Sequence, residues 1–144
     1  MNFSQDDINK LNQAPFLIFF LVSAADGQID KKEVVEFSKV LGRPEVLQNP
    51  HLRSIIHNVQ DKIPEILMDM LTRKLNYITE LEALRAIAEK NLSADEANNF
   101  KIALFLLGKT IAEASGGFLG FGSKISKDEK AALTAIALCL GIKA

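Results

Sequence analysis

The chain has 144 residues, of which 48% are apolar and 24% charged, and its 17 basic and 18 acidic residues give a formal net charge of −1. The apolar fraction and low net charge exclude an intrinsically disordered chain, and the single cysteine, Cys139, excludes a disulfide scaffold. The balance of charge, without a basic block, argues against a nucleic-acid-binding protein. The length predicts one compact domain over residues 1–144.

Apolar residues recur at helical spacing along the chain, so we predict an all-α fold, a compact bundle of seven or eight helices. Val34, Phe37 and Leu41, for example, share one helical face. No segment combines sustained alternation with hairpin turns, so we expect no strands. The predicted helices cover residues 5–12, 15–25, 31–41, 51–61, 64–76, 79–90, 94–115 and 127–140.

The run from Pro15 to Ala25 is the most apolar early segment. It has 11 residues, whereas a membrane-spanning helix needs about 20. Acidic Asp6 and Asp7 precede it, whereas a secretory signal begins with basic residues. We interpret this run and a second stretch, Phe100–Ala112, as buried central helices, and we expect a cytoplasmic protein without a transmembrane segment.

Several residues mark helix ends. In three places a small polar residue precedes a glutamate by three positions, a pattern in which the first side chain caps the helix and the glutamate accepts from the cap's own N–H. These pairs are Asp30 with Glu33, Ser93 with Glu96, and Ser126 with Glu129. First helical positions suit proline and C-terminal caps suit glycine; the candidates are Pro15, Pro44, Pro64, Gly42 and Gly141.

An internal repeat relates residues 25–33 to residues 114–129. Each copy reads as an apolar helix, an Ala-(Asp/Ser)-Gly corner, an isoleucine, a cap with its glutamate, and a second apolar helix ending in Leu-Gly. The second copy carries an insertion, Gly117–Lys124. This duplication predicts two pseudo-symmetric helix–corner–helix halves around a shared core.

The first corner also matches positions 5 to 12 of an EF-hand loop, with oxygen donors at Asp26, Asp30 and Glu33. Val22 and Ala24 occupy positions 1 and 3 and cannot bind calcium, which excludes a complete EF-hand. The three carboxylates either serve as helix caps and a turn or share a divalent cation, and both interpretations stay open at this point. Oxygen-only ligands would favour calcium or magnesium.

The corner Ala24-Ala25-Asp26-Gly27-Gln28-Ile29-Asp30-Lys31-Lys32-Glu33 resembles the signature of the tellurite-resistance TerB-like family. The helix from Ile125 to Leu133, continuing to Gly141, resembles the second copy of that signature. The same fold is found in the N-terminal region of DjlA-type co-chaperones. The resemblance spans Pro15 to Gly141, although the middle segment matches only in its helical character. It implies two related helical halves whose acidic residues gather on one side and bind a divalent cation.

Carried over by position, the resemblance implies a weak calcium or magnesium site made of Asp26, Glu33 and Glu129, with Asp30 assisting. Ser115 stands where the second aspartate belongs, and the glycine-rich insertion follows it. This departure weakens the affinity that we expect. We expect no other cofactor.

Residues 116–124 are rich in glycine and carry Phe118, Leu119 and Phe121. They do not form a phosphate-binding loop, because Ser123-Lys124 reverses the required order and a helix precedes them. The three apolar residues either close the corner against the bundle or contact a protein partner or a membrane face.

No catalytic constellation emerges from the remaining residues. His51 and His57 are six positions apart and point in different directions on one helix, and Cys139 lies in an apolar helix end. An enzyme would need a deep pocket beside Asp26 or Glu129. We therefore expect a non-enzymatic binding or scaffold module in a stress or tellurite-resistance setting. Its partner is an unidentified protein, with membrane association left open. The alternative is a metal-free protein-interaction or peripheral membrane-contact bundle that uses residues 116–124.

Overall fold

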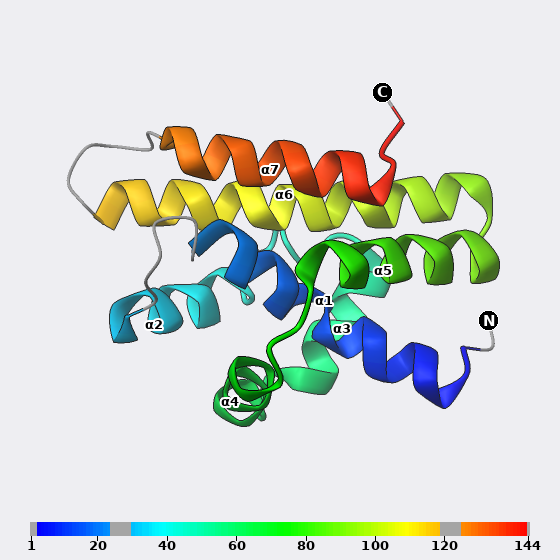
Figure 1. The fold of residues 1–144 in the computed structure, drawn as a ribbon, viewed down its shortest axis with the longest axis horizontal. Helices are drawn as coiled ribbons and strands as arrows, with labels where there is room; N and C mark the ends of the chain where they lie inside the picture. The colour runs from blue at the N-terminus through cyan, green and yellow to red at the C-terminus, as the bar shows by residue number, and fades with distance from the viewer. Residues whose placement is uncertain (1–2, 24–29, 119–124, 144) are drawn as a thin grey trace.

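The computed structural model describes residues 3–23, 30–118 and 125–143, with the backbone alone for residues 115–118. These ranges contain helices and loops but no strands, which confirms the all-α prediction (Figure 1). The described helices are α1 (Gln5–Ser23), α2 (Lys31–Val40), α3 (Pro50–Val59), α4 (Ile63–Arg73), α5 (Tyr77–Asn91), α6 (Ala94–Phe118) and α7 (Lys127–Leu140).

Helix α1 lies at the centre of the bundle. Residues 16–20 follow one another along the helix, yet each is at most 2% exposed. A helix with apolar residues on every side needs neighbours on every side, and α1 contacts α3, α4, α5, α6 and α7. The prediction that residues 15–25 supply a buried central helix is confirmed for the part that the structure describes.

Aromatic contacts fix α2 and α5 against α1. Phe37 of α2 stacks on Phe19 with ring centroids 4.4 Å apart and meets Phe16 edge-on at 5.6 Å. Tyr77, the first residue of α5, stacks on Phe20 at 5.9 Å. Such aromatic pairs add about 0.5–1.5 kcal/mol beyond the burial of their area.

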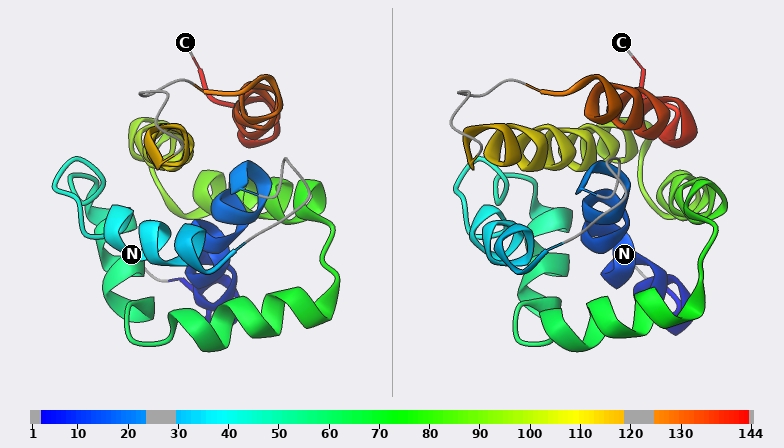
Figure 2. Two further views of the ribbon diagram at one scale, coloured as in Figure 1. Left: turned by 90° about the vertical axis from the view of Figure 1, so that its left-hand side faces the viewer. Right: turned by 60° about the vertical axis from the view of Figure 1, so that its left-hand side comes forward.

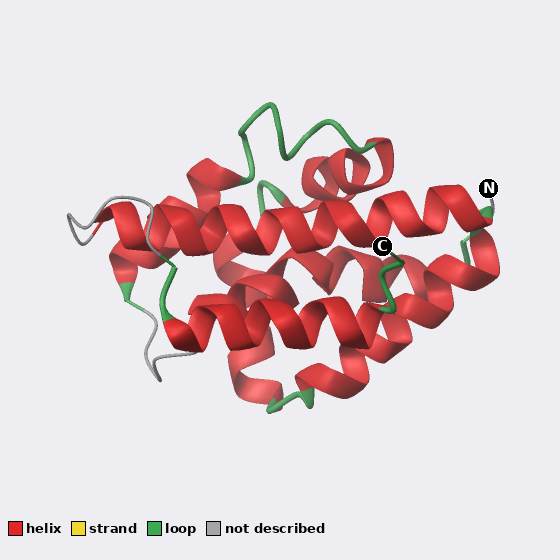
Figure 3. Ribbon diagram, turned by 90° about the horizontal axis from the view of Figure 1, so that it is seen from above, coloured by secondary structure: helices red, strands yellow, loops and turns green. Residues whose placement is uncertain are grey.

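Helices α6 and α7 form an antiparallel pair that packs across α1 (Figures 1 and 3). Gly108 of α6 lies at this crossing. A Cβ atom there would stand 3.0 Å from Leu133 Cδ2 of α7 and 3.1 Å from Ile18 Cγ2 of α1. A glycine at this position therefore lets three helices approach closely at one point.

The second helix of each predicted half packs against the first helix of the other half. Helix α2, which follows α1, packs on α6, and α7, which follows α6, packs on α1. The contact between the two long helices is extensive, and Phe100, Leu104, Leu107 and Ile111 of α6 are at most 4% exposed. The second predicted central helix is therefore confirmed as well.

Several predicted boundaries were wrong. Residues 5–12 and 15–23 form one continuous helix, so Pro15 lies inside α1 and not at a helix start. A proline in a helix removes one N–H donor, and the burial of Pro15 and its neighbours keeps the helix continuous despite this loss. Residues 43–47 form turns, with the Leu47 N–H donating to the Arg43 carbonyl at 3.1 Å, so no α-helix begins at Pro44.

Other predicted helix ends agree more closely with the structure. Pro64 lies in the first turn of α4, and Gly141 caps α7 in the left-handed conformation with φ of 68°. Gly42 directly follows the C-cap Leu41 and donates its N–H to the Lys39 carbonyl at 3.1 Å. Helix α6 continues beyond the predicted end at residue 115, through Gly116 and Gly117, to Phe118. The repeat was therefore wrong in one respect, because Ala114-Ser115-Gly116 continues the helix and does not form a corner.

The C-cap of α4 departs from what residue preferences suggest, because Lys74 adopts the left-handed conformation with φ of 50°. A side chain with a Cβ is disfavoured in that conformation, and glycine is not. We predict that Lys74→Gly raises the free energy of unfolding by about 0.5–1 kcal/mol. Urea unfolding measures the change.

Lys109→Gly is the matched control, because Lys109 is also an exposed lysine but lies in the interior of α6. It should lower the free energy of unfolding by about 1 kcal/mol. The two Lys→Gly substitutions should therefore change the free energy of unfolding in opposite directions. A loss of stability in Lys74→Gly would contradict the left-handed cap.

Candidate functional site

Four helix ends gather at one end of the bundle: the C-termini of α1 and α6 and the N-termini of α2 and α7 (Figure 2). They are the ends that adjoin the two corners picked out by the sequence repeat. The corner residues 24–29 and 119–124 lie outside the described residues, and Asp26 is among them. The described part of the candidate site therefore consists of the first turns of α2 and α7 and the helices beneath them.

Asp30 and Glu33 form a complete capping box at the start of α2. The Glu33 N–H donates to Asp30 Oδ1 at 2.8 Å, and the Asp30 N–H donates to Glu33 Oε1 at 3.3 Å. Each side chain thus binds an amide that has no partner within the helix. The capping interpretation of these two carboxylates is confirmed.

Ser126 and Glu129 form the same box at the start of α7. The Glu129 N–H donates to Ser126 Oγ at 3.1 Å, and the Ser126 N–H donates to Glu129 Oε1 at 3.0 Å. The third predicted cap is present too, since the Glu96 N–H donates to Ser93 Oγ at 3.1 Å. The two helices that follow the corners of the repeat, α2 and α7, therefore both start with a capping box.

The structure describes three of the four predicted metal ligands, Asp30, Glu33 and Glu129. Within residues 3–23, 30–118 and 125–143, no three His, Cys, Asp or Glu side chains lie close enough to hold a metal ion together. Asp30, Glu33 and Glu129 alone therefore do not form a site. A site that also uses Asp26 stays a prediction, because Asp26 lies outside the described residues.

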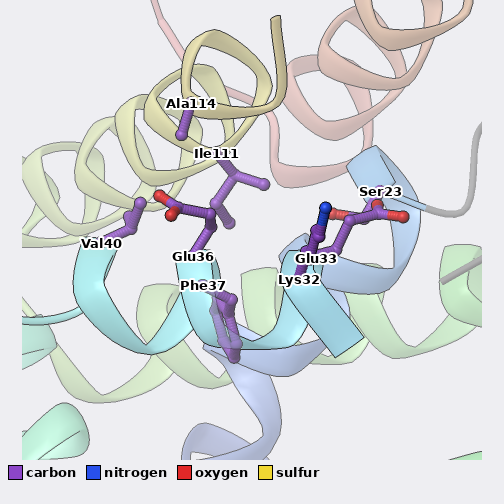
Figure 4. A pocket seen from close by; sticks show the side chains of 8 residues that line it. All are labelled: Ser23, Lys32, Glu33, Glu36, Phe37, Val40, Ile111 and Ala114. Carbon is purple, nitrogen blue, oxygen red and sulfur yellow. The ribbon is translucent and has the colours of Figure 1, made fainter. Parts of the chain in front are cut away.

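A small cavity lies beside Glu33, between α1, α2 and α6 (Figure 4). Its polar lining comes from Ser23, Lys32, Glu33 and Glu36, and the apolar lining comes from Phe37, Val40, Ile111 and Ala114. Figure 4 shows Lys32 and Glu33 on the side of Ser23, whereas Glu36 extends toward Ile111. The cavity volume of about 20 Å³ is room for a water molecule and not for an organic substrate.

The histidines and the cysteine lie elsewhere. His51, in the first turn of α3, stands 3.5 Å from a Glu96 carboxylate oxygen and meets the ring of Phe100 edge-on. The hydrogen bonds from Ser93, together with His51, hold the pKa of Glu96 below its ordinary value. His57 is exposed, and Cys139 is half-buried.

A second polar cluster joins α5 and α6, and it was not predicted from the sequence. Lys101 is only 4% exposed, and its Nζ lies 2.5 Å from Glu89 Oε2. Arg85 Nε donates to the same oxygen at 3.1 Å. The hydrogen bonds from Lys101 and then Arg85 hold the pKa of Glu89 below its ordinary value. The Arg85–Glu89 pair has helical spacing, but nothing along the chain connects Lys101 to it.

A scan against protein-family models, a search of curated proteins and a search of solved structures each find no match to this chain. Among the described helices, none combines the length and the apolar character needed to cross a bilayer.

The Lys101–Glu89 pair generates a prediction about acid stability. Glu89 has a lower pKa in the folded chain than in the unfolded chain, so its ionised form stabilises the fold above pH 4.5, its ordinary pKa. This contribution is lost as the pH falls through the lowered pKa. Glu89→Gln should cost about 1 kcal/mol at pH 7, a value kept small because solvent reaches Glu89. It should also flatten the decline of stability below pH 4.5.

Lys101→Met is the matched variant, because it removes the buried ammonium and keeps an unbranched apolar side chain that is one atom shorter. It should cost less than Glu89→Gln, which leaves that ammonium buried without its carboxylate. Urea unfolding between pH 3 and pH 7 measures both variants. A larger loss for Lys101→Met than for Glu89→Gln at pH 7 would contradict this account.

Proposed function

We propose that this chain is a non-catalytic helical binding module of the TerB-like kind. In this proposal a weak divalent-cation site forms at its corner from Asp26, Glu33 and Glu129, with Asp30 assisting. The observation that supports it is the matching capping boxes at the starts of α2 and α7, at the end of the bundle where the C-termini of α1 and α6 also lie. The stress or tellurite-resistance setting rests on the family resemblance alone.

The capping geometry favours a weak site. A carboxylate has about four acceptor positions, and Glu33 and Glu129 each use Oε1 for a cap N–H. In the proposal, the two carboxylates bind the cation while each keeps its cap hydrogen bond. The N-terminus of a helix carries partial positive charge, which opposes a cation there. We therefore expect the site to bind calcium or magnesium, which prefer oxygen ligands, only at millimolar concentrations of the ion.

A non-catalytic role agrees with the space beside these carboxylates. The cavity next to Glu33 has a volume of about 20 Å³, and general acid–base catalysis needs a substrate within hydrogen-bond reach. The described part of the corner supplies carboxylates but no room for an organic substrate beside Glu33.

Calcium titration followed by backbone amide chemical shifts tests the proposal. We expect saturable shifts at millimolar calcium in the first turns of α2 and α7, because the binding carboxylates accept from those amides. Asp26→Asn should remove the shifts. Asp128→Asn is the matched control, since Asp128 is an exposed first-turn acid of α7 outside the proposed site, and it should keep them.

A corner that does not respond up to about 10 mM calcium, or a response that survives in Asp26→Asn, would contradict the cation site. The alternative is then a metal-free bundle that binds a protein or a membrane face through residues 116–124. That alternative predicts that partner capture survives Asp26→Ala and is lost when Phe118 and Phe121 are both replaced by Ser.

A further inference from the structure

A cleft between α5, α6 and the segment that follows α7 gathers basic side chains from all three. Arg85 of α5, Lys101 of α6 and Lys143 after α7 line it, together with a single carboxylate, Glu89. The described lining therefore has a formal charge of +2. The whole chain has a net charge of −1, so this excess of positive charge is local to the cleft.

Contacts between the three segments hold the basic groups in place. Glu89 Oε2 accepts from Lys101 Nζ at 2.5 Å and from Arg85 Nε at 3.1 Å. The Lys143 N–H donates to Asn98 Oδ1 at 3.0 Å, which fixes the segment after α7 against α6. The positive charges of the cleft are therefore positioned before any ligand binds.

Two of the basic side chains keep donors that the chain itself does not use. A guanidinium has five N–H donors and an ammonium has three. Within the described part of the chain, Arg85 donates only through Nε, and the ammonium of Lys143 has no partner. Both side chains are open to solvent, since the Arg85 side chain is 47% exposed and Lys143 is exposed. A ligand in the cleft can therefore reach both.

Gly141 makes room for one of these groups. A Cβ atom at this position would stand 2.6 Å from Arg85 Cζ and 2.9 Å from Nη1. Any larger residue would therefore displace the guanidinium from the end of α7. The left-handed cap of α7 and the position of Arg85 depend on the same glycine.

The charge and size of the cleft indicate the class of ligand. An excess of two positive charges matches a phosphate group, which carries about −1.5 to −2 at pH 7, and Arg and Lys are frequent phosphate ligands. The cleft has a volume of about 390 Å³, and small-molecule sites occupy about 300–1,000 Å³. Leu92, Ala94 and Ala97 add an apolar wall. A phosphate group with a small organic group attached fits this space.

We propose that this cleft binds a phosphate group, with the Nη groups of Arg85 and the Nζ of Lys143 donating to its oxygens. The buried charge of Lys101 adds to the attraction, and Glu89 holds Lys101 and Arg85 in place. The phosphate belongs either to a small monoester or to inorganic phosphate. The site is independent of the proposed cation site, because no residue belongs to both.

Glycerol 3-phosphate and glycerol test the proposal, because they differ only in the phosphate group. Each is titrated into the full chain in a phosphate-free buffer at constant ionic strength and followed by backbone amide shifts. We expect saturable shifts at millimolar glycerol 3-phosphate in the C-terminal half of α5, the first two turns of α6 and residues 141–143. Glycerol should give none. Inorganic phosphate is the third ligand, and the tighter of the two phosphates identifies the source of the group.

Arg85→Gln and Lys143→Gln each remove one positive charge from the cleft. Each should weaken the binding of glycerol 3-phosphate about three- to tenfold. Lys90→Gln is the matched control, since Lys90 is an exposed lysine in the last turn of α5 that does not line the cleft. It should change the affinity by less than about twofold. If Arg85→Gln does not fold, the comparison of Lys143→Gln with Lys90→Gln decides the outcome.

The proposal is overturned if neither phosphate gives saturable shifts up to about 10 mM, or if the shifts centre on helices away from the cleft. It is also overturned if Lys90→Gln weakens binding as much as Lys143→Gln does. The general attraction of an anion to basic side chains would then explain the binding.

Discussion

The arrangement of this bundle depends on the enclosure of α1. Its C-terminal half presents apolar side chains in every direction, with residues 16–20 each at most 2% exposed, so no face of it can be left to water. The aromatic rings of α2 and α5 cover parts of this surface, and α6 and α7 cover another. Gly108 lets α6 approach both neighbours at once.

This enclosure also places the candidate cation site. Helix α1 ends at Ser23, directly before the first repeat corner in the sequence, and its C-terminus lies at the same end of the bundle as the C-terminus of α6. The N-terminal half of α1 carries polar residues such as Asn12 and Gln13, and there the enclosure is incomplete. A cavity of about 200 Å³ lies against that half.

The sequence predicted those features that depend on local spacing. Helical faces such as that of Phe100, Leu104 and Leu107 followed from periodicity, and the caps at Asp30 and Ser126 followed from one residue pair each. Pro15 was wrong as a helix start because burial outweighs the hydrogen bond that it removes. The first turns of α2 and α7, which follow the two corners along the chain, were therefore predictable, including their hydrogen bonds.

Features that join distant segments were not predictable. Lys101 lies in an apolar stretch, and only the packing of α6 on α5 reveals its contact with Glu89. The cleft that Lys101 lines depends on how α5, α6 and the segment after α7 meet, and no local pattern records that. The left-handed conformation of Lys74 could not be predicted from the sequence either, since glycine or asparagine is the usual residue in that conformation.

Native-state hydrogen exchange tests the enclosure of α1 most directly. The amides of residues 16–20 should exchange only through global unfolding, with an opening free energy and denaturant dependence equal to those of the whole chain. The amides of α4, where Met68 is 65% exposed and Leu71 is 56% exposed, should open locally at lower free energy. Exchange of the α1 amides through local opening, at a free energy below that of α7, would contradict the central role of α1.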